Sequence, residues 1–291
     1  MPELPEVEVT RRRIAPVLVG RTLRSVRTTA PSYFFITPPL RLKRALAGRT
    51  VKDLTRRGKY LLAEIDDGGR LLLHLGMTGQ LFSSNVASVR LLSATARASL
   101  APDEQLRFEP DVHTHLRLSF ADDGPDVFFR DVRKFGKVQL LAAGEPCERL
   151  SKLGPDALEL ADGALFEAAR GRSVAIKSLL LDQAVIAGAG NIYADEALFL
   201  AGVRPRRPAR KVTRAECARI VAGLKRVLLR SIETGGSSIS DYVAPDGSDG
   251  AYQDERRVYA REGEGCSRCG GRIQRVVIGQ RSAHYCAGCQ K

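Results

Sequence analysis

The chain has 291 residues and carries 46 Lys and Arg against 33 Asp and Glu, which gives a formal net charge of +13. This length argues against one compact domain and accommodates two domains with a small appendage. The charge indicates a polyanionic partner, and nucleic acid is the first candidate because neutralised phosphates release condensed counterions. An anionic membrane surface is the alternative. The sequence has no run of about eighteen apolar residues and no signal-peptide core, so we expect a cytoplasmic protein.

The first eight residues, MPELPEVE, place a proline amine beside carboxylates. Removal of an initiator Met before Pro would expose the secondary amine of Pro2. At about pH 7.5 roughly a quarter of an α-amino group is neutral and nucleophilic, against about a tenth of a percent of a Lys side chain. A secondary amine that attacks an aldehyde-like carbon forms an iminium, an electron sink that favours elimination. The alternative is a proline-flanked arm before a helix whose N-terminus the Glu residues stabilise.

The N-terminal part, residues 1–146, is predicted to be a β-sandwich preceded by a helix. Apolar residues at helical spacing predict the helix at 5–18, which would anchor Pro2 to a core. Short runs separated by turns then predict the sandwich. The strands are expected at residues 22–29, 60–65, 70–75, 115–120, 127–130 and 137–141. Residues 83–110 show no clean period and are predicted to be a surface insertion.

A helical domain is predicted after a linker at residues 147–156. It covers residues 157–250 and ends in a polar loop from Gly235 onward. Its last helix should begin with a capping box formed by Thr213 and Glu216. The helices are expected at residues 158–170, 174–187, 191–201 and 215–234.

The C-terminal segment, residues 251–291, has the spacing of a zinc finger. Two C-x2-C pairs, separated by sixteen residues, can supply four thiolates to one tetrahedral ion. Zinc contributes on the order of 10 kcal/mol to the folding of so small a unit. The alternative is two disulfides, and the isolated Cys147 and Cys217 are predicted to be buried thiols. The expected ligands are Cys266, Cys269, Cys286 and Cys289.

The finger is also predicted to lie on phosphate and to contain a β-hairpin. From residue 256 to 291 there are seven Arg and one Lys against two Glu. The hairpin strands are expected at 272–278 and 282–285. Another candidate phosphate contact is the turn at 188–194, where small residues expose N–H groups at a helix N-terminus and Asn191 can donate from its amide. By itself this turn is more often a helix cap.

Further candidate DNA-contacting residues lie in two loops and at the start of one strand, and each is weak evidence by itself. Lys59 begins an apolar strand, where a surface Lys is the usual interpretation. Met77 follows another strand and would ordinarily be a core or loop residue. Arg133 and Phe135 lie two residues apart in a turn, a pattern sometimes used to enter a base stack.

Taken in order, the opening string, the turn before a helix and the cysteine pairs resemble the formamidopyrimidine-DNA glycosylase family of bifunctional base-excision repair enzymes. The resemblance covers the whole chain except the insertion. It implies an α+β multidomain fold, with an N-terminal β-sandwich, a helical domain carrying a helix-two-turn-helix and a C-terminal zinc-finger hairpin. It further implies one structural Zn²⁺, no redox or nucleotide cofactor, and a monomer that binds damaged double-stranded DNA in the nucleoid.

The resemblance also implies roles for individual residues. Pro2 attacks C1′ of the deoxyribose, Glu3 shuttles protons and Glu6 orients groups within the site. Oxidised purines, 8-oxoguanine or formamidopyrimidines, are flipped out under the loop at 235–252 and excised, and β,δ-elimination then nicks the strand. Lys59 and Arg281 contact phosphates near the lesion as part of the catalytic set. The DNA-binding set implied is His74, Met77, Arg133, Phe135, Lys177, Asn191 and Arg281, with Met77, Arg133 and Phe135 as the wedge that fills the gap in the stack.

The sequence departs from the family pattern at two positions, and two alternative functions stay open. Val132 stands where the family usually has Pro, and Ser173 stands where some members have Lys. An endonuclease VIII-like enzyme for oxidised pyrimidines shares the amine, the helical module and the finger, but Leu4 and the Arg133–Phe135 wedge argue against it. The other alternative is a non-catalytic zinc-dependent protein that binds damaged DNA.

Overall fold

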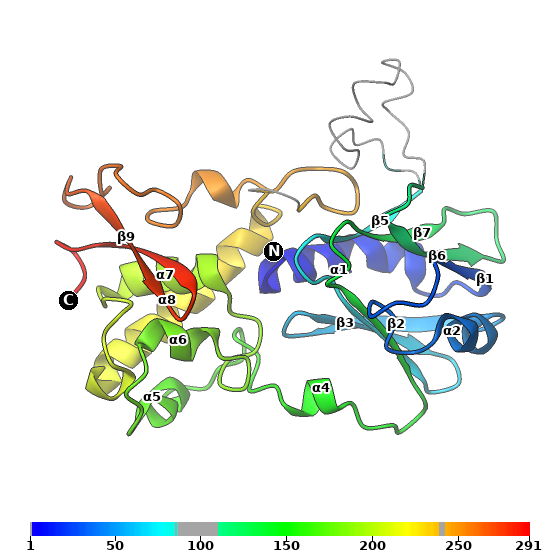
Figure 1. Ribbon diagram of the computed structural model, residues 1–291, viewed down its shortest axis with the longest axis horizontal. Helices are drawn as coiled ribbons and strands as arrows, with labels where there is room; N and C mark the ends of the chain where they lie inside the picture. Colours follow the sequence, from blue (N-terminus) through cyan, green and yellow to red (C-terminus); the bar gives the residue numbers. More distant parts are fainter. Residues whose placement is uncertain (1, 85, 87–109, 239–241) are drawn as a thin grey trace, which may run out of the picture. The chain divides into compact units, whose positions relative to one another are not determined.

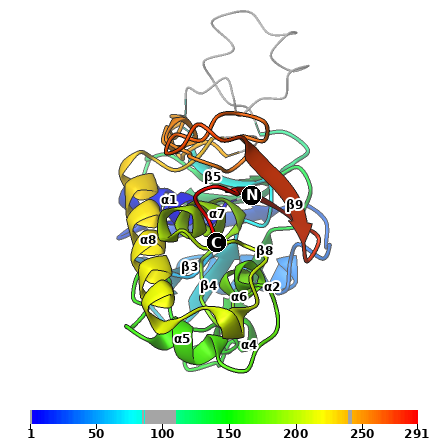
Figure 2. The same ribbon diagram turned by 90° about the vertical axis from the view of Figure 1, so that its left-hand side faces the viewer.

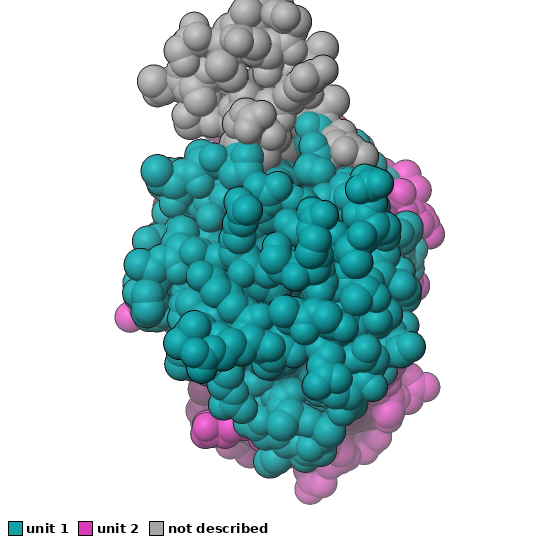
Figure 3. Space-filling model, turned by 90° about the vertical axis from the view of Figure 1, so that its right-hand side faces the viewer, with its two compact units in different colours: residues 1–147, 234–251 teal, residues 148–233, 252–291 magenta. Residues whose placement is uncertain are grey.

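The computed structural model describes residues 2–84, 86, 110–238 and 242–291. Most of the insertion expected at 83–110 lies outside the described residues. The chain divides into two compact units, coloured separately in Figure 3. Unit 1 comprises residues 1–147 and 234–251, and unit 2 comprises residues 148–233 and 252–291. No helix among the described residues is long and apolar enough to cross a membrane.

Unit 1 contains two four-stranded antiparallel sheets, as expected for a β-sandwich with an N-terminal helix. One sheet has the order β1-β6-β7-β5 and the other β2-β3-β4-β8. Strands β3 and β8 have the expected bounds. The strands are β1 (Leu23–Thr28), β2 (Val51–Arg57), β3 (Tyr60–Ile65), β4 (Arg70–His74), β5 (Gly79–Ser83), β6 (Thr114–Phe120), β7 (Val127–Asp131) and β8 (Lys137–Leu141).

Helix α1 (Leu4–Leu18) belongs to this core, and Figure 1 shows it alongside strands of both sheets. Val7, Ile14 and Leu18 are buried with residues from each sheet. Their helical spacing predicted the helix because these residues form its buried face. The N-terminal residues are therefore attached to the largest apolar core of the unit. A second helix, α2 (Pro39–Leu46), contacts β1 and was not predicted from the sequence.

Unit 2 combines α-helices of 4 to 20 residues with the finger hairpin. Figures 1 and 2 show α7 beside α8, and α7 also contacts β10. Its elements are α4 (Glu148–Ser151), α5 (Ala164–Ala169), α6 (Ile176–Leu181), α7 (Asn191–Ala201), η3 (Ala209–Lys211), α8 (Arg214–Glu233), η4 (Tyr252–Asp254), β9 (Ile273–Ile278) and β10 (Arg281–Cys286). The capping box of α8 forms as expected: the Thr213 N–H donates to Glu216 Oε2 at 2.8 Å, and the Glu216 N–H donates to Thr213 Oγ1 at 3.3 Å.

Several helix bounds differ from the sequence prediction. The helix expected at 158–170 is only six residues long, because Gly163 adopts a left-handed conformation at its N-cap. The helix expected at 174–187 ends at Leu181, and the predicted linker contains α4. Residues 234–250 were expected in the helical domain, but the segment 234–251 packs in unit 1, because its backbone and side chains bind α1.

Candidate functional site

The N-terminal residues of unit 1 form a buried, hydrogen-bonded start to α1. Pro2, Glu3 and Glu6 are all buried. Glu3 and Glu6 form a capping box in which the Glu3 N–H donates to Glu6 Oε2 at 2.8 Å. The structural role that the sequence offered as an alternative is thus real, and it holds the residue after Pro2 in place. Glu3 is the N-cap of α1 and Glu6 lies in its first turn, so both carboxylates lie close in sequence to Pro2.

Glu6 also binds the segment 234–251, called the loop segment below. Its second oxygen, Oε1, accepts the Ser237 N–H at 2.9 Å. Gly236 has a φ of 89°, and a Cβ there would lie 3.3 Å from Glu6, so the backbone approaches this carboxylate closely. Tyr242 is buried in the same segment, and burial together with the charge of Glu6 raises the pKa of its phenol. The two oxygens of Glu6 therefore join the start of α1 to a segment more than 200 residues away in sequence.

A second attachment lies further along α1. Arg13 forms an ion pair of 2.5 Å with Asp246 and also donates to the hydroxyl of Ser248. Asp246 in turn accepts the Ser248 N–H, so the turn is internally braced. Residues 239–241 lie outside the described part of the chain. The described parts of the loop segment are held against α1 at two places.

Lys59 lies in the tight turn between β2 and β3, which is held to α1 by an ionic network. Arg56 donates to Glu8 at 3.1 Å and to the carbonyl of Gly58, directly before Lys59, at 2.9 Å. Burial alone would raise the pKa of Glu8, but hydrogen bonds from Arg11 and Arg12 outweigh it and lower that pKa to about 2. Glu8 is therefore ionised at neutral pH and fixes the turn that carries Lys59.

Met77, Arg133 and Phe135 lie on two loops of unit 1. Phe135 is 44% exposed, and the Arg133 guanidinium lies 4.9 Å from the centre of its ring. His74, at the start of the first loop, accepts the Gly76 N–H at 3.1 Å, and its ring packs 4.7 Å from that of Tyr60. The structure thus brings together an exposed aromatic and a cation in the second loop, with His74 helping to shape the first.

In unit 2, the turn before α7 is built by a side chain that the sequence reasoning missed. Gln183 accepts the Gly188 N–H at 3.0 Å and donates to the Ala189 carbonyl at 2.9 Å. Asn191 is the first residue of α7 and is half-buried. Gln183 fixes the glycine-containing turn. The sequence feature that could have indicated this role is an amide side chain five residues before Gly188.

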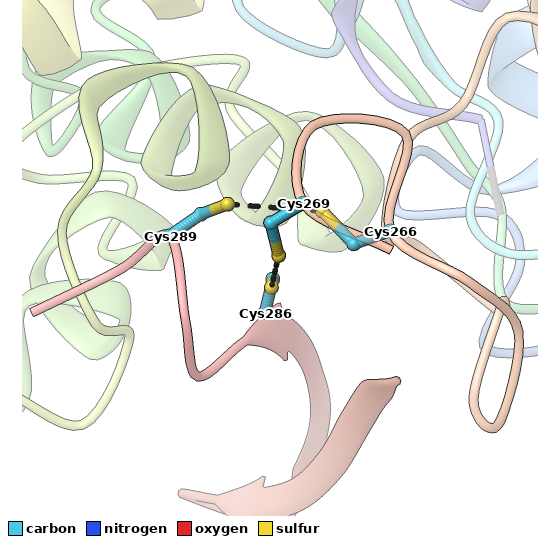
Figure 4. Close-up of side chains that lie close together, drawn as sticks. All are labelled: Cys266, Cys269, Cys286 and Cys289. Carbon is cyan, nitrogen blue, oxygen red and sulfur yellow. Dashed lines mark hydrogen bonds between the residues drawn. The ribbon is translucent and has the colours of Figure 1, made fainter. Parts of the chain in front are cut away.

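The four predicted zinc ligands converge at the end of the hairpin, as Figure 4 shows. Their sulfur atoms all lie within 4.8 Å of one another, and the Cys266–Cys289 and Cys269–Cys286 separations are 3.8 Å and 3.4 Å. A tetrahedral zinc with bonds of about 2.3 Å separates its sulfurs by about 3.8 Å, whereas a disulfide requires about 2.05 Å. The donor set and spacing fit one structural zinc. The other two cysteines, Cys147 and Cys217, are buried thiols as predicted.

Lys177 requires a correction, because it lies inside unit 2. Its side chain is fully buried, with Nζ 2.6 Å from an Asp195 carboxylate oxygen and 2.5 Å from the Ser282 carbonyl of β10. A buried, paired ammonium does not neutralise a phosphate directly, so this structure gives Lys177 a structural role in place of a DNA contact. Arg281, the neighbour of Ser282, is exposed at the start of β10 and follows the left-handed Gln280 of the hairpin turn.

Comparison with protein families identifies the three parts of the chain. Residues 1–138 match the formamidopyrimidine-DNA glycosylase N-terminal domain, and residues 153–243 match the H2TH domain of the same glycosylase. Residues 263–291 match a zinc finger found in FPG and IleRS.

Curated relatives cover the full length. The chain is 39% identical over 293 residues to a formamidopyrimidine-DNA glycosylase of Xanthomonas campestris pv. campestris. It is 42% identical over 296 residues to one of Thioalkalivibrio sulfidiphilus. Both alignments cover 100% of each chain.

Solved structures agree with this fold. A complex between the Lactococcus lactis Fpg and DNA containing an abasic site superposes with a TM-score of 0.86 at 34% identity, covering 100% of both chains. The MutM (FPG) protein from Thermus thermophilus gives a TM-score of 0.83 at 38% identity, covering 99% of this chain and 98% of that one.

Proposed function

This chain belongs to the formamidopyrimidine-DNA glycosylase family, and we propose that it excises oxidised purines from double-stranded DNA with the amine of Pro2 as nucleophile. It is a base-excision repair glycosylase and abasic-site lyase with one structural zinc. The observation that carries the proposal is the buried start of α1, where Pro2 precedes two carboxylates and Glu6 binds the loop segment. The family's damaged-DNA partner would place the protein in the nucleoid.

The proposed reaction uses few protein groups. The Pro2 nitrogen attacks C1′, the N-glycosidic bond breaks, and Glu3 moves a proton to the departing base and the opening sugar. The resulting C1′ iminium acidifies C2′. Loss of a C2′ proton breaks the C3′–O bond and releases the 3′ phosphate, which nicks the strand. A second elimination breaks the C5′–O bond and releases the 5′ phosphate, and hydrolysis of the iminium by water frees Pro2. Glu6 keeps the loop segment against α1 while the base is bound.

The remaining residues act on DNA. Lys59, Arg281 and Asn191 bind backbone phosphates, which fix the register of the duplex without reading its sequence. His74 supports the loop of Met77, and the three wedge residues enter the base stack as the damaged nucleotide leaves it.

Borohydride trapping tests the nucleophile. Reduction of the iminium should join the chain beginning at Pro2 covalently to DNA that contains 8-oxoguanine or an abasic site. A short peptide extension before residue 2 should reduce the adduct by at least about 100-fold, because an internal Pro nitrogen is an amide and is not nucleophilic. The same extension placed after Lys291 is the control. Undiminished nicking by the N-terminally blocked protein would show that Pro2 is not the nucleophile.

The same assay separates the alternatives. Faster excision of 8-oxoguanine than of thymine glycol supports a purine enzyme, and the reverse order supports an endonuclease VIII-like one. Tight binding to damaged DNA with neither a nick nor an adduct would indicate the non-catalytic protein.

A further inference from the structure

The two loops that carry the wedge residues are neighbours, and each connects one sheet of unit 1 to the other. Residues 75–78 connect β4 to β5, and residues 132–136 connect β7 to β8. Strand β5 pairs with β7, with Gly79 opposite Asp131, and β4 pairs with β8, with His74 opposite Lys137. The strands that flank one loop therefore pair with the strands that flank the other, and the two loops lie next to each other at both ends.

The backbones of the two loops are in direct contact. A Cβ added to Gly76 would lie 2.5 Å from both Gly136 N and the carbonyl carbon of Phe135. A Cβ added to Gly136 would lie 3.0 Å from the carbonyl oxygen of His74. Because neither position has room for a side chain, movement of one loop displaces the other.

A buried carboxylate joins these loops. Asp131 is fully buried and accepts the Thr78 hydroxyl at 2.5 Å from the first loop. Within the second loop it accepts the Gly136 N–H at 2.7 Å and the Arg133 N–H at 3.2 Å. Thr78 Oγ1 lies 3.1 Å from the same Arg133 nitrogen. A charged acceptor with several donors forms stronger hydrogen bonds than neutral pairs do.

We propose that Asp131 and Thr78 are positioning residues that fix the reach of Met77 relative to Arg133 and Phe135, and so determine how efficiently the wedge displaces a stacked base. This inference rests on the proposed function of those loops. Val132 adds little restraint to the second loop, because its φ is not fixed by a proline ring and its side chain is 47% exposed. The loop backbone is held instead by Asp131, at Arg133 and Gly136, and by Tyr33, at the Arg133 carbonyl.

The proposal predicts an effect on one half of the reaction only. Excision of an intact 8-oxoguanine requires the base to leave the stack, whereas a preformed abasic site has no base to displace. Asp131→Asn should therefore lower the single-turnover rate of 8-oxoguanine excision by at least about tenfold, because an amide loses the charge and one acceptor oxygen. Nicking and borohydride trapping at a preformed abasic site should change by less than about threefold, because no stacked base has to be displaced there.

Three further variants make the test specific. Thr78→Val should reproduce part of the loss, and Thr78→Ser, which keeps the hydroxyl, should restore the wild-type rate. Asp126→Asn is the control, since Asp126 precedes the other end of β7 and pairs with Arg117. Fluorescence of 2-aminopurine opposite the lesion should show delayed unstacking in Asp131→Asn and Thr78→Val.

The outcomes separate this inference from the proposed function. Equal losses on both substrates, or none, in Asp131→Asn and Thr78→Val would overturn the positioning role while wild-type trapping still supported Pro2. Absence of trapping in the wild-type chain would instead contradict the proposed nucleophile. If Asp131→Asn fails to fold, Thr78→Val with its Ser rescue decides the question.

Discussion

The two ends of the chain are held in different ways. The C-terminal finger has the four zinc ligands and, in addition, two buried carboxylates of α7. Glu196 accepts three consecutive backbone N–H groups, from residues 257–259, at 2.9 Å each, and Asp195 accepts the His284 N–H at 2.8 Å. The N-terminal site is held by the apolar core that includes α1 and by hydrogen bonds and ion pairs between α1 and the residues around it. A metal site therefore supports one functional end in addition to side-chain contacts, whereas the other relies on packing and side-chain electrostatics.

Because the two ends are held differently, different changes should destabilise them. The four zinc ligands lie within 24 residues, so one ion holds the two ends of this short segment together. Loss of a ligand should therefore first disrupt the folding of the hairpin between them. The carboxylates of α7 then provide a second, independent support for the same unit. At the N-terminal site Glu6 and Glu8 make local contacts within α1, but Glu6, Glu8 and Arg13 also each bind residues distant in sequence, so its support depends on the rest of unit 1.

The largest expected effect is loss of the metal. Cys269→Ser should release zinc at low chelator concentrations, because one of four thiolates is removed from a site that contributes on the order of 10 kcal/mol. A chromophoric chelator measures the release, and fluorescence anisotropy should show weaker binding to DNA. Cys217→Ser, at a buried thiol outside the site, should retain both zinc and affinity. Retention of stoichiometric zinc by Cys269→Ser would contradict the four-cysteine site.

The second support is tested through the buried ion pair. Lys177→Met leaves Asp195 without its ammonium partner and should lower the free energy of unfolding by about 3–5 kcal/mol. Denaturation in urea with zinc present measures the change. Arg281→Ala, at an exposed position, should leave stability nearly unchanged and reduce the slope of log affinity against log salt by about 0.9.

The same pair of variants checks the revised role of Lys177. If Lys177→Met altered the salt slope as much as Arg281→Ala while preserving stability, the buried role would be wrong and a direct phosphate contact would be favoured.

The sequence predicted local elements better than long-range attachments. The bounds of β3, β8 and α7 were predicted because their apolar patterns are continuous, and the cysteine spacing specifies its own geometry. Strand β2 was missed since only Val51 and Leu54 of its residues are buried. A strand that is mostly polar has little periodic signal.

The site residues show the same limit. Pro2, Glu3 and Glu6 were proposed from one short string and their catalytic roles stay predictions, but nothing in the polar loop segment indicated that it packs against α1. Lys177 was misjudged because its burial depends on Asp195, eighteen residues away, and on a carbonyl of the finger. Partners that folding brings together leave no pattern in either segment alone.

The smallest effect tests the electrostatic support of the N-terminal site. The pKa of Glu8 falls from about 4.5 in an unfolded chain to about 2 in the folded protein, so its stabilisation is present above about pH 4.5 and is lost as pH falls toward 2. After allowance for solvent screening, this amounts to about 1–2 kcal/mol.

Glu8→Gln should therefore lower the free energy of unfolding at pH 7 and flatten its dependence on pH between about 4.5 and 3. Urea denaturation at several pH values measures both quantities, with the exposed Glu64→Gln as the matched control. Because Arg56 also holds the Gly58 carbonyl directly before Lys59, the variant should weaken the proposed phosphate contact of Lys59 even at neutral pH. If Glu8→Gln kept the wild-type pH dependence, the ionic network would not be what holds this turn to α1, and the contrast with the metal-held finger would lose its basis.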